Sequence, residues 1–241
     1  MQRIKSRIST ALHFNQWTTV LFYLFLATDI GFIILHFLHS YSALLIPGQL
    51  TADAFSLATD RGFSEVFQYL KEYWIALLLG FLAARNRSLL YLSWSLLFAY
   101  ILLDDASSIH KRLGFFISKQ LSFVPLFNLR AVDYGEMIVS AGVGLFFLIA
   151  IATVYRFGDR FARQVSKTLT LLLLALAFFG IVIDMLHIML RMPALDPLLT
   201  ALEDGGELII MSIIACYALS QAVAKRAEQR VESRKLVSPI E

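Results

Sequence analysis

The sequence predicts an all-α protein, a polytopic membrane bundle of six transmembrane helices with both termini in the cytoplasm. The composition is the first indication: 58% of the 241 residues are apolar and only 16% are charged, whereas about a quarter of the residues in a soluble domain are charged. The second is a series of six apolar runs, each bounded by charged or turn residues. Together they exclude a soluble globular fold.

The runs define the helices in order. The first follows a basic, polar segment (1–16), lacks a cleavage pattern and is too long for a signal-peptide core, so it stays as a helix. The second, third and sixth runs are shorter than the roughly 20 residues that a bilayer requires, and we expect polar residues to complete them. A charged tail (225–241) follows the last helix. The expected spans are 17–38, 64–84, 88–105, 136–155, 168–190 and 203–224.

The orientation follows from the basic residues. Fourteen of the 21 Lys and Arg residues lie at the helix ends that also carry both termini, which predicts that this side is cytoplasmic. We therefore expect a multi-pass protein of the cell (inner) membrane. The net charge of +3 favours anionic lipid headgroups as partners of this surface and does not indicate nucleic acid. The single cysteine, Cys216, lies within the last run, so an intrachain disulfide is excluded.

The acids gather at the opposite, outer end. Thirteen of the 18 Asp and Glu residues and four of the five histidines lie there, although positive-inside sorting says little about acids. Basic side chains can snorkel at the cytoplasmic ends of the short runs, so the missing helical length is expected at the outer ends. An acid at mid-bilayer costs about 2.5–3.5 kcal/mol, so several acids together predict partners in the bundle interior.

Helical spacing indicates which of these residues act together. Asp184 and His187 are three residues apart and share a face of the fifth helix, and Glu203 and Glu207 are four apart in the sixth. Each pair offers two ligands from one helix.

Two further pairs of residues could act as metal ligands only under certain conditions. Asp133 and Glu136 lie at the start of the fourth helix, where carboxylates also favour the helix dipole, so capping and ligation are both open. Asp105 and His110 are about 140° apart around a straight helix. They can share one ion only if the helix bends or unwinds between them.

Carboxylates and imidazoles together suit a divalent transition metal such as Fe, Zn or Mn, and the absence of usable thiolates argues against a Cys-rich site. Carboxylate-bridged di-metal bundles add a single Glu from each of two helices to a Glu-x-x-His from each of two others. The chain matches that ligand set only in part, because a second carboxylate-x-x-His is missing. The predicted metal ligands are Asp105, His110, Glu136, Asp184, His187, Glu203 and Glu207, with Glu65 and Glu72 as second-line candidates.

The residues indicate a place more clearly than a reaction, and whether the protein is an enzyme stays open. We expect metal-dependent hydrolysis or oxidation of a lipid-soluble, lipid-like or quinone-like substrate. The alternatives are a proton- or cation-coupled transporter, whose path Asp29 could extend, and a non-catalytic accessory subunit of an oligomer or larger membrane complex. A serine hydrolase is disfavoured because no Gly-x-Ser-x-Gly occurs. A haem between His36 and His187 would leave the acids unexplained.

Three connecting features complete the expectations. The longest outer loop (39–62) could fold back over the site as a lid, and the segment 115–127 is apolar enough for an interfacial helix. Ser140 and Gly144 have the small-x-x-x-small spacing of closely packed membrane helices.

Overall fold

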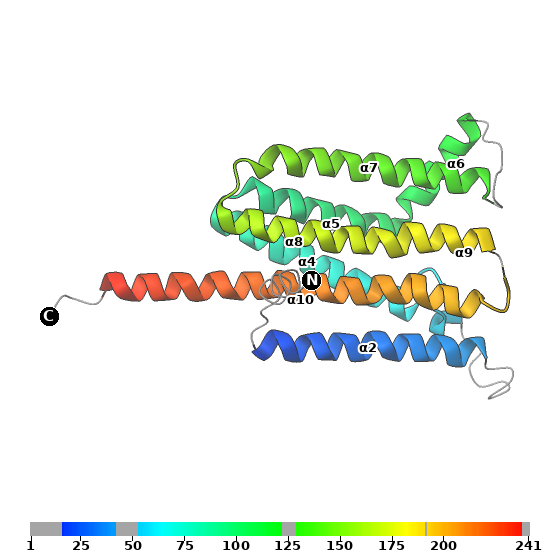
Figure 1. The fold of residues 1–241 in the computed structure, drawn as a ribbon, viewed down its shortest axis with the longest axis horizontal. Coiled ribbons are helices and arrows are strands. Elements are labelled where there is room, and N and C mark those ends of the chain that lie inside the picture. The colour runs from blue at the N-terminus through cyan, green and yellow to red at the C-terminus, as the bar shows by residue number, and fades with distance from the viewer. Residues whose placement is uncertain (1–15, 42–52, 122–128, 191, 238–241) are drawn as a thin grey trace, which may run out of the picture.

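The computed structural model describes residues 16–41, 53–121, 129–190 and 192–237, with side chains described up to residue 224. Every regular element within these residues is helical. The elements are α2 (Gln16–Ser40), the short 3₁₀ helix η1 (Asp53–Phe55), α4 (Phe63–Asn86), α5 (Leu89–Ser107), α6 (Ile109–Gln120), α7 (Ala131–Tyr155), α8 (Arg160–Ala177), the π-helix η2 (Phe178–Ile183), α9 (Asp184–Leu190) and α10 (Asp196–Val237). Figure 1 shows the long helices side by side, with the end of α10 projecting beyond the bundle.

Six segments are long and apolar enough to cross a membrane, so the predicted six-span helical bundle is confirmed. They are Gln16–Ser40, Phe63–Asn86, Leu89–Ser107, Ala131–Tyr155, Arg160–Leu190 and Asp196–Ala224. The fifth span is one path through α8, η2 and α9. The basic N-terminal segment lies outside the described residues except for Gln16, and the predicted orientation of the termini stays a prediction.

The extra helical length lies at the acid-rich end, as the short apolar runs predict. Helix α4 begins at Phe63, α5 continues to Ser107 and α10 begins at Asp196, so each is extended by polar turns there. The fourth and sixth helices begin at Ala131 and Asp196, earlier than the expected 136 and 203, because polar first turns carry no apolar signal.

Helix α10 is the centre of the bundle and α7 lies at its edge. Of the most apolar stretch of α10, 56% is buried, against 6% for α7. The core forms where α4 packs against α5 and α10, and its largest fully buried apolar members are Trp94, Tyr91, Phe98, Ile75, Leu79, Leu82, Leu90, Leu169, Met211 and Ile214. Helix α2 packs on the other side of α10. A rigid core therefore supports the acid-rich end.

The small residues of α7 serve two different purposes. Gly135 meets Gly114 of α6 so closely that a Cβ on Gly135 would lie 2.1 Å from the Gly114 carbonyl oxygen, and only glycine permits this contact. In contrast, no neighbouring atom lies within 4 Å of a Cβ on Gly144. The expectation that Ser140 and Gly144 mark close helix packing is therefore wrong at Gly144, which faces open space because α7 stands away from α8.

Candidate metal centre

A cavity of about 810 Å³ occupies the acid-rich end of the bundle, between α4, α5, α6, α7, α9 and α10. All seven predicted metal ligands line it, and so does the second-line candidate Glu65. The described part of the predicted lid also contributes, since residues 57–60 form part of the wall. The sequence-based grouping of these residues around one space therefore agrees with the structure.

The helix breaks where the pairing of Asp105 with His110 requires it. Ser108 has a φ of 51°, in the left-handed region, so it ends α5 and begins α6. Figure 1 shows α6 turning away from the direction of α5. The unwound residue removes the angular separation that a straight helix would impose. His110 thereby reaches the acids of the preceding turn.

Asp104, Asp105 and His110 form the tightest group of candidate ligands among the described residues. One ligand atom from each lies within 4.8 Å of the others. Asp104 holds the geometry: its Oδ1 accepts from the His110 backbone N–H at 2.7 Å, and its Oδ2 lies 3.0 Å from His110 Nδ1. The hydrogen bond to Asp104 raises the pKa of His110 above its ordinary 6.5, although burial opposes the shift. Asp104 therefore holds both the backbone and the Nδ1 side of the His110 ring.

A second acid–histidine group lies across the cavity on α9 and α10. His187 Nδ1 lies 2.9 Å from Glu203 Oε2, and its Nε2 lies 3.0 Å from Asp196 Oδ1. Asp184 adds a carboxylate beside Glu203. A neutral imidazole donates from one nitrogen only, so a metal at His187 would replace one of these two carboxylate contacts.

The π-helix η2 positions the wall between the two groups. Gly180 lies within it, and a Cβ there would stand 2.2 Å from Glu207 Oε1. Only glycine leaves room for that carboxylate, whose other oxygen accepts from Gln68 Nε2 at 3.3 Å. Single π turns are frequent at functional sites because they re-aim side chains. Here the π turn directly precedes Asp184.

A family model described as a domain of unknown function, DUF8692, matches residues 18–222. The chain belongs to this family. No match was found among curated proteins or among solved structures. The match extends from the first described helix into α10, so the whole cavity lies within the DUF8692 region.

Asp133 and Glu136, for which capping and metal ligation were both expected alternatives, have different roles in this DUF8692 chain. Asp133 is a capping residue: it accepts from the Arg130 backbone N–H at 2.6 Å and binds the Arg130 guanidinium at 2.8 Å. Glu136, one turn further along α7, lines the cavity, and its backbone packs against Gly114.

The two basic side chains that line the cavity are Lys111 and Arg130. Lys111 forms an ion pair with the exposed Asp60 at 2.8 Å, and Arg130 pairs with Asp133. Both basic side chains at the cavity are therefore already paired.

One side chain was misplaced by the sequence reasoning. Lys71 counts there among the outer basic residues, but it is fully buried within α4. Its Nζ lies 3.0 Å from Asp29 Oδ1 and donates to the Leu208 carbonyl and to Ser212 Oγ at 2.8 and 3.1 Å. Ser212 Oγ in turn donates to Asp29 Oδ2 at 2.5 Å. Lys71 lies within the expected span 64–84, but its ion pair with Asp29 was not predicted because the two residues lie on different helices.

Glu72 differs from all other acids near the site. It is fully buried and does not line the cavity, its carboxyl group lies against that of Asp105, and no backbone or basic group donates to its oxygens. The acids that act on it most strongly are Asp105 and Glu207. Two buried carboxyl groups in contact cannot both be ionised without compensation, so Glu72 and Asp105 either share a proton or lie beside a cation.

The sequence reasoning missed two residues of the site. Asp104 is the residue that organises His110, and Asp204 lines the cavity from α10. A signal for Asp204 was present, because it is three residues from Glu207 and shares its helix face. Asp104 could not be distinguished from its neighbour Asp105 without knowing the helix break.

His36 has a structural role instead of a haem-binding one. The Leu57 backbone N–H donates to its Nδ1 at 3.3 Å, so Nε2 carries the proton and donates to the Pro197 carbonyl at 3.1 Å. Both nitrogens are engaged, and the ring ties α2 to the segment after η1 and to the start of α10.

Proposed function

We propose that the cavity binds a divalent transition metal at Asp104, Asp105 and His110 and uses it for hydrolysis of a lipid-soluble substrate. The charge balance of the cavity carries this proposal. Ten acidic residues line it against Lys111 and Arg130, and these two are paired with Asp60 and Asp133. Carboxylates crowded into a membrane bundle require compensation, and a divalent cation supplies it.

Glu72 supports the proposal independently. Its buried carboxyl group lies against that of Asp105, one of the three proposed ligands, and no backbone or basic group donates to its oxygens. An ion at Asp105 would offset the charge of this buried group. Two carboxylate oxygens and one imidazole form an oxygen-rich set that suits Mn, Fe or Zn.

The acids that line the cavity but are not proposed as metal ligands suit hydrolysis. Three protein ligands leave a position for water, and a bound metal lowers the pKa of that water towards neutrality. Glu136 and Glu207 line the same cavity and could accept its proton. This arrangement needs no external electron donor, which favours hydrolysis over oxidation.

The walls of the cavity favour an amphipathic substrate. Acids line it from α4, α5, α7, α9 and α10, and Met137 and Ala141 of α7 with Ile181 and Ile188 of the fifth span add apolar surface among them. Helix α7 is the least buried span and does not pack closely against α9. A lipid-soluble molecule could enter between them from the bilayer.

A transport role has less support. The buried Asp29–Lys71 pair extends polar groups below the cavity, but Ile75, Leu79 and Met211 beyond it are completely buried in the apolar core. A cation path would have to cross this packed layer. The Asp29–Lys71 pair therefore fits the closed inner end of a binding site better than part of a transport path.

Elemental analysis of the purified protein tests the proposal. We expect about one equivalent of Zn, Mn or Fe in the parent protein, loss of that metal in His110→Ala and Asp105→Asn, and retention in His39→Ala, whose side chain does not line the cavity. A parent protein without stoichiometric metal would refute the metal centre. Release of product from lipid esters or amides by the metal-loaded protein, compared with ion uptake into vesicles, then separates hydrolysis from transport.

A further inference from the structure

A second cavity, of about 350 Å³, lies at the basic end of the bundle between α5, α7 and α8. It exists because α7 and α8 join through a short connection but do not pack closely along their lengths. Trp94 of α5, Gly144 and Ile151 of α7 and Leu173 of α8 form parts of its wall. Its volume falls in the range of small-molecule sites. This second cavity shares no lining residue with the candidate metal centre.

The wall of this cavity is apolar because its polar groups are already satisfied. Trp94 Nε1 donates to Ser166 Oγ at 2.9 Å, and Thr170 Oγ1 donates to the Ser166 carbonyl at 2.9 Å. Most of the other residues that line the cavity are apolar. The interior therefore suits a hydrocarbon chain.

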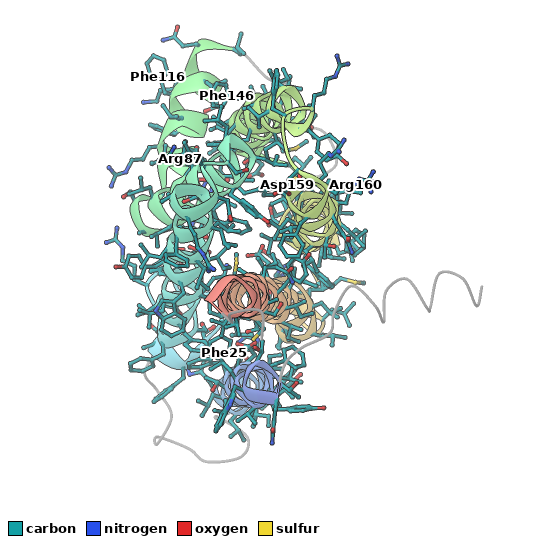
Figure 2. All side chains as sticks on the ribbon, turned by 90° about the vertical axis from the view of Figure 1, so that its left-hand side faces the viewer. Phe25, Arg87, Phe116, Phe146, Asp159 and Arg160 are labelled. Atoms are coloured by element: carbon teal, nitrogen blue, oxygen red, sulfur yellow. The ribbon has the colours of Figure 1, made fainter. Side chains whose placement is uncertain are left out.

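The charged groups of the cavity are two cations. Arg156 follows the end of α7, and Lys167 lies about two turns into α8. Neither forms an ion pair with an acid of the described residues. Figure 2 looks onto this end and shows Asp159 and Arg160 at the start of α8. Asp159 is engaged in the helix cap, where it accepts from the Ala162 N–H at 2.6 Å.

We propose that this cavity binds an anionic phospholipid, with an acyl chain between α7 and α8 and its phosphate against Arg156 and Lys167. An apolar slot with two uncompensated cations at its membrane-surface end is complementary to that molecule in both polarity and charge. Lys167 reaches the headgroup because a long side chain can extend towards the interface. The bound lipid fills the space that α7 leaves open and holds this edge helix to the bundle.

Lipid retention by the purified full-length protein tests the charge recognition. We expect the parent, equilibrated with mixed phosphatidylglycerol and phosphatidylcholine micelles, to retain phosphatidylglycerol preferentially when bound lipid is counted by mass spectrometry. The double variant Arg156→Gln/Lys167→Gln should reduce this preference about tenfold to thirtyfold, since each basic residue contributes roughly one factor of five. Arg87→Gln, also at the basic end but outside the cavity, should keep it. Equal retention of both lipids by the parent would overturn the proposal.

Two matched variants of α7 test the place of the chain. Gly144→Leu places a side chain in the wall of the cavity at a position where the Cβ meets no atom within 4 Å. Gly142→Leu adds the same side chain at an equally open position outside the cavity. We expect Gly144→Leu to lose most of the retained lipid and Gly142→Leu to keep it. Equal retention by the two variants would show that the lipid binds elsewhere.

Discussion

The buried Asp29–Lys71 pair allows a sharp test of the fold. Both side chains are completely inaccessible, and Lys71 Nζ has three oxygen partners from α2 and α10. Its ammonium also lies 4.7 Å from the centre of the Phe67 ring. Replacing Lys71 with Met keeps an unbranched side chain that is one atom shorter, and it removes the ammonium group with its charge and its hydrogen bonds.

The expected cost is large. Removing one partner of a buried ion pair leaves the other charge uncompensated, and such changes destabilise proteins by about 3–5 kcal/mol. Lys71→Met leaves the Asp29 carboxylate with the Ser212 hydroxyl as its hydrogen-bond donor. The double variant Lys71→Met/Asp29→Asn removes both charges, and we expect it to recover most of the loss. The coupling between the two positions should exceed about 2 kcal/mol.

Reversible unfolding in mixed micelles, followed by circular dichroism during a denaturing-detergent titration, measures these free energies. The matched control is Lys111→Met, which removes an equally short but exposed ion pair with Asp60. An exposed pair contributes about 0–1 kcal/mol, so this variant should be nearly neutral. Equal effects of Lys71→Met and Lys111→Met, or additive effects in the double variant, would refute the reasoning.

Three further outcomes are expected. Gly135→Ala should destabilise the protein by about 1–3 kcal/mol in the same unfolding assay, because α6 must move away from α7 to make room for the methyl group. Gly142→Ala should not, because no atom lies near its Cβ. Similar stabilities of the two variants would contradict the close contact of Gly135 with Gly114. Ser108→Gly should keep metal affinity, whereas Ser108→Val, strained at a φ of 51°, should lose about 1–2 kcal/mol of stability and bind metal more weakly, as calorimetry will show. The pKa of His110 is raised in the folded protein by its hydrogen bond with Asp104. The contribution of this bond to the stability of the metal-free protein is therefore complete below pH 6.5 and is lost as the pH rises through the higher pKa of the folded state. Metal affinity should strengthen over that same interval, because protons stop competing; a flat affinity between pH 6 and 8 would exclude His110 as a ligand.

The fold was largely predictable because the bilayer imposes simple rules on sequence. Long apolar runs must be helices, and runs that are too short must borrow polar residues. That argument placed the extra turns of α4, α5 and α10 at the acid-rich end. It failed for Lys71, since hydropathy measures a residue's own polarity and not the partner that Asp29 supplies from another helix.

The sequence predicted many residues that line the candidate site, but it missed Asp104 and Asp204 and did not predict the geometry. Regular helical spacing identified Asp184 with His187, and Glu203 with Glu207, because i, i+3 and i, i+4 neighbours always share a face. The Asp105–His110 pair required a bend at Ser108, a residue with no strong preference for the left-handed conformation. The role of Asp104 as the residue that orients His110 follows only from that bend.

The sequence by itself determined the class of the protein, the number of its spans and the end of the bundle where acids and histidines gather, because these depend on local composition and period. Only the tertiary structure decided which carboxylates are paired, which lie against one another, and where α7 leaves space beside α8. These properties depend on contacts between helices distant in the chain. Glu72 shows the difference most clearly: its sequence position gives one more acid on a helix face, whereas its packing buries its carboxyl group against that of Asp105.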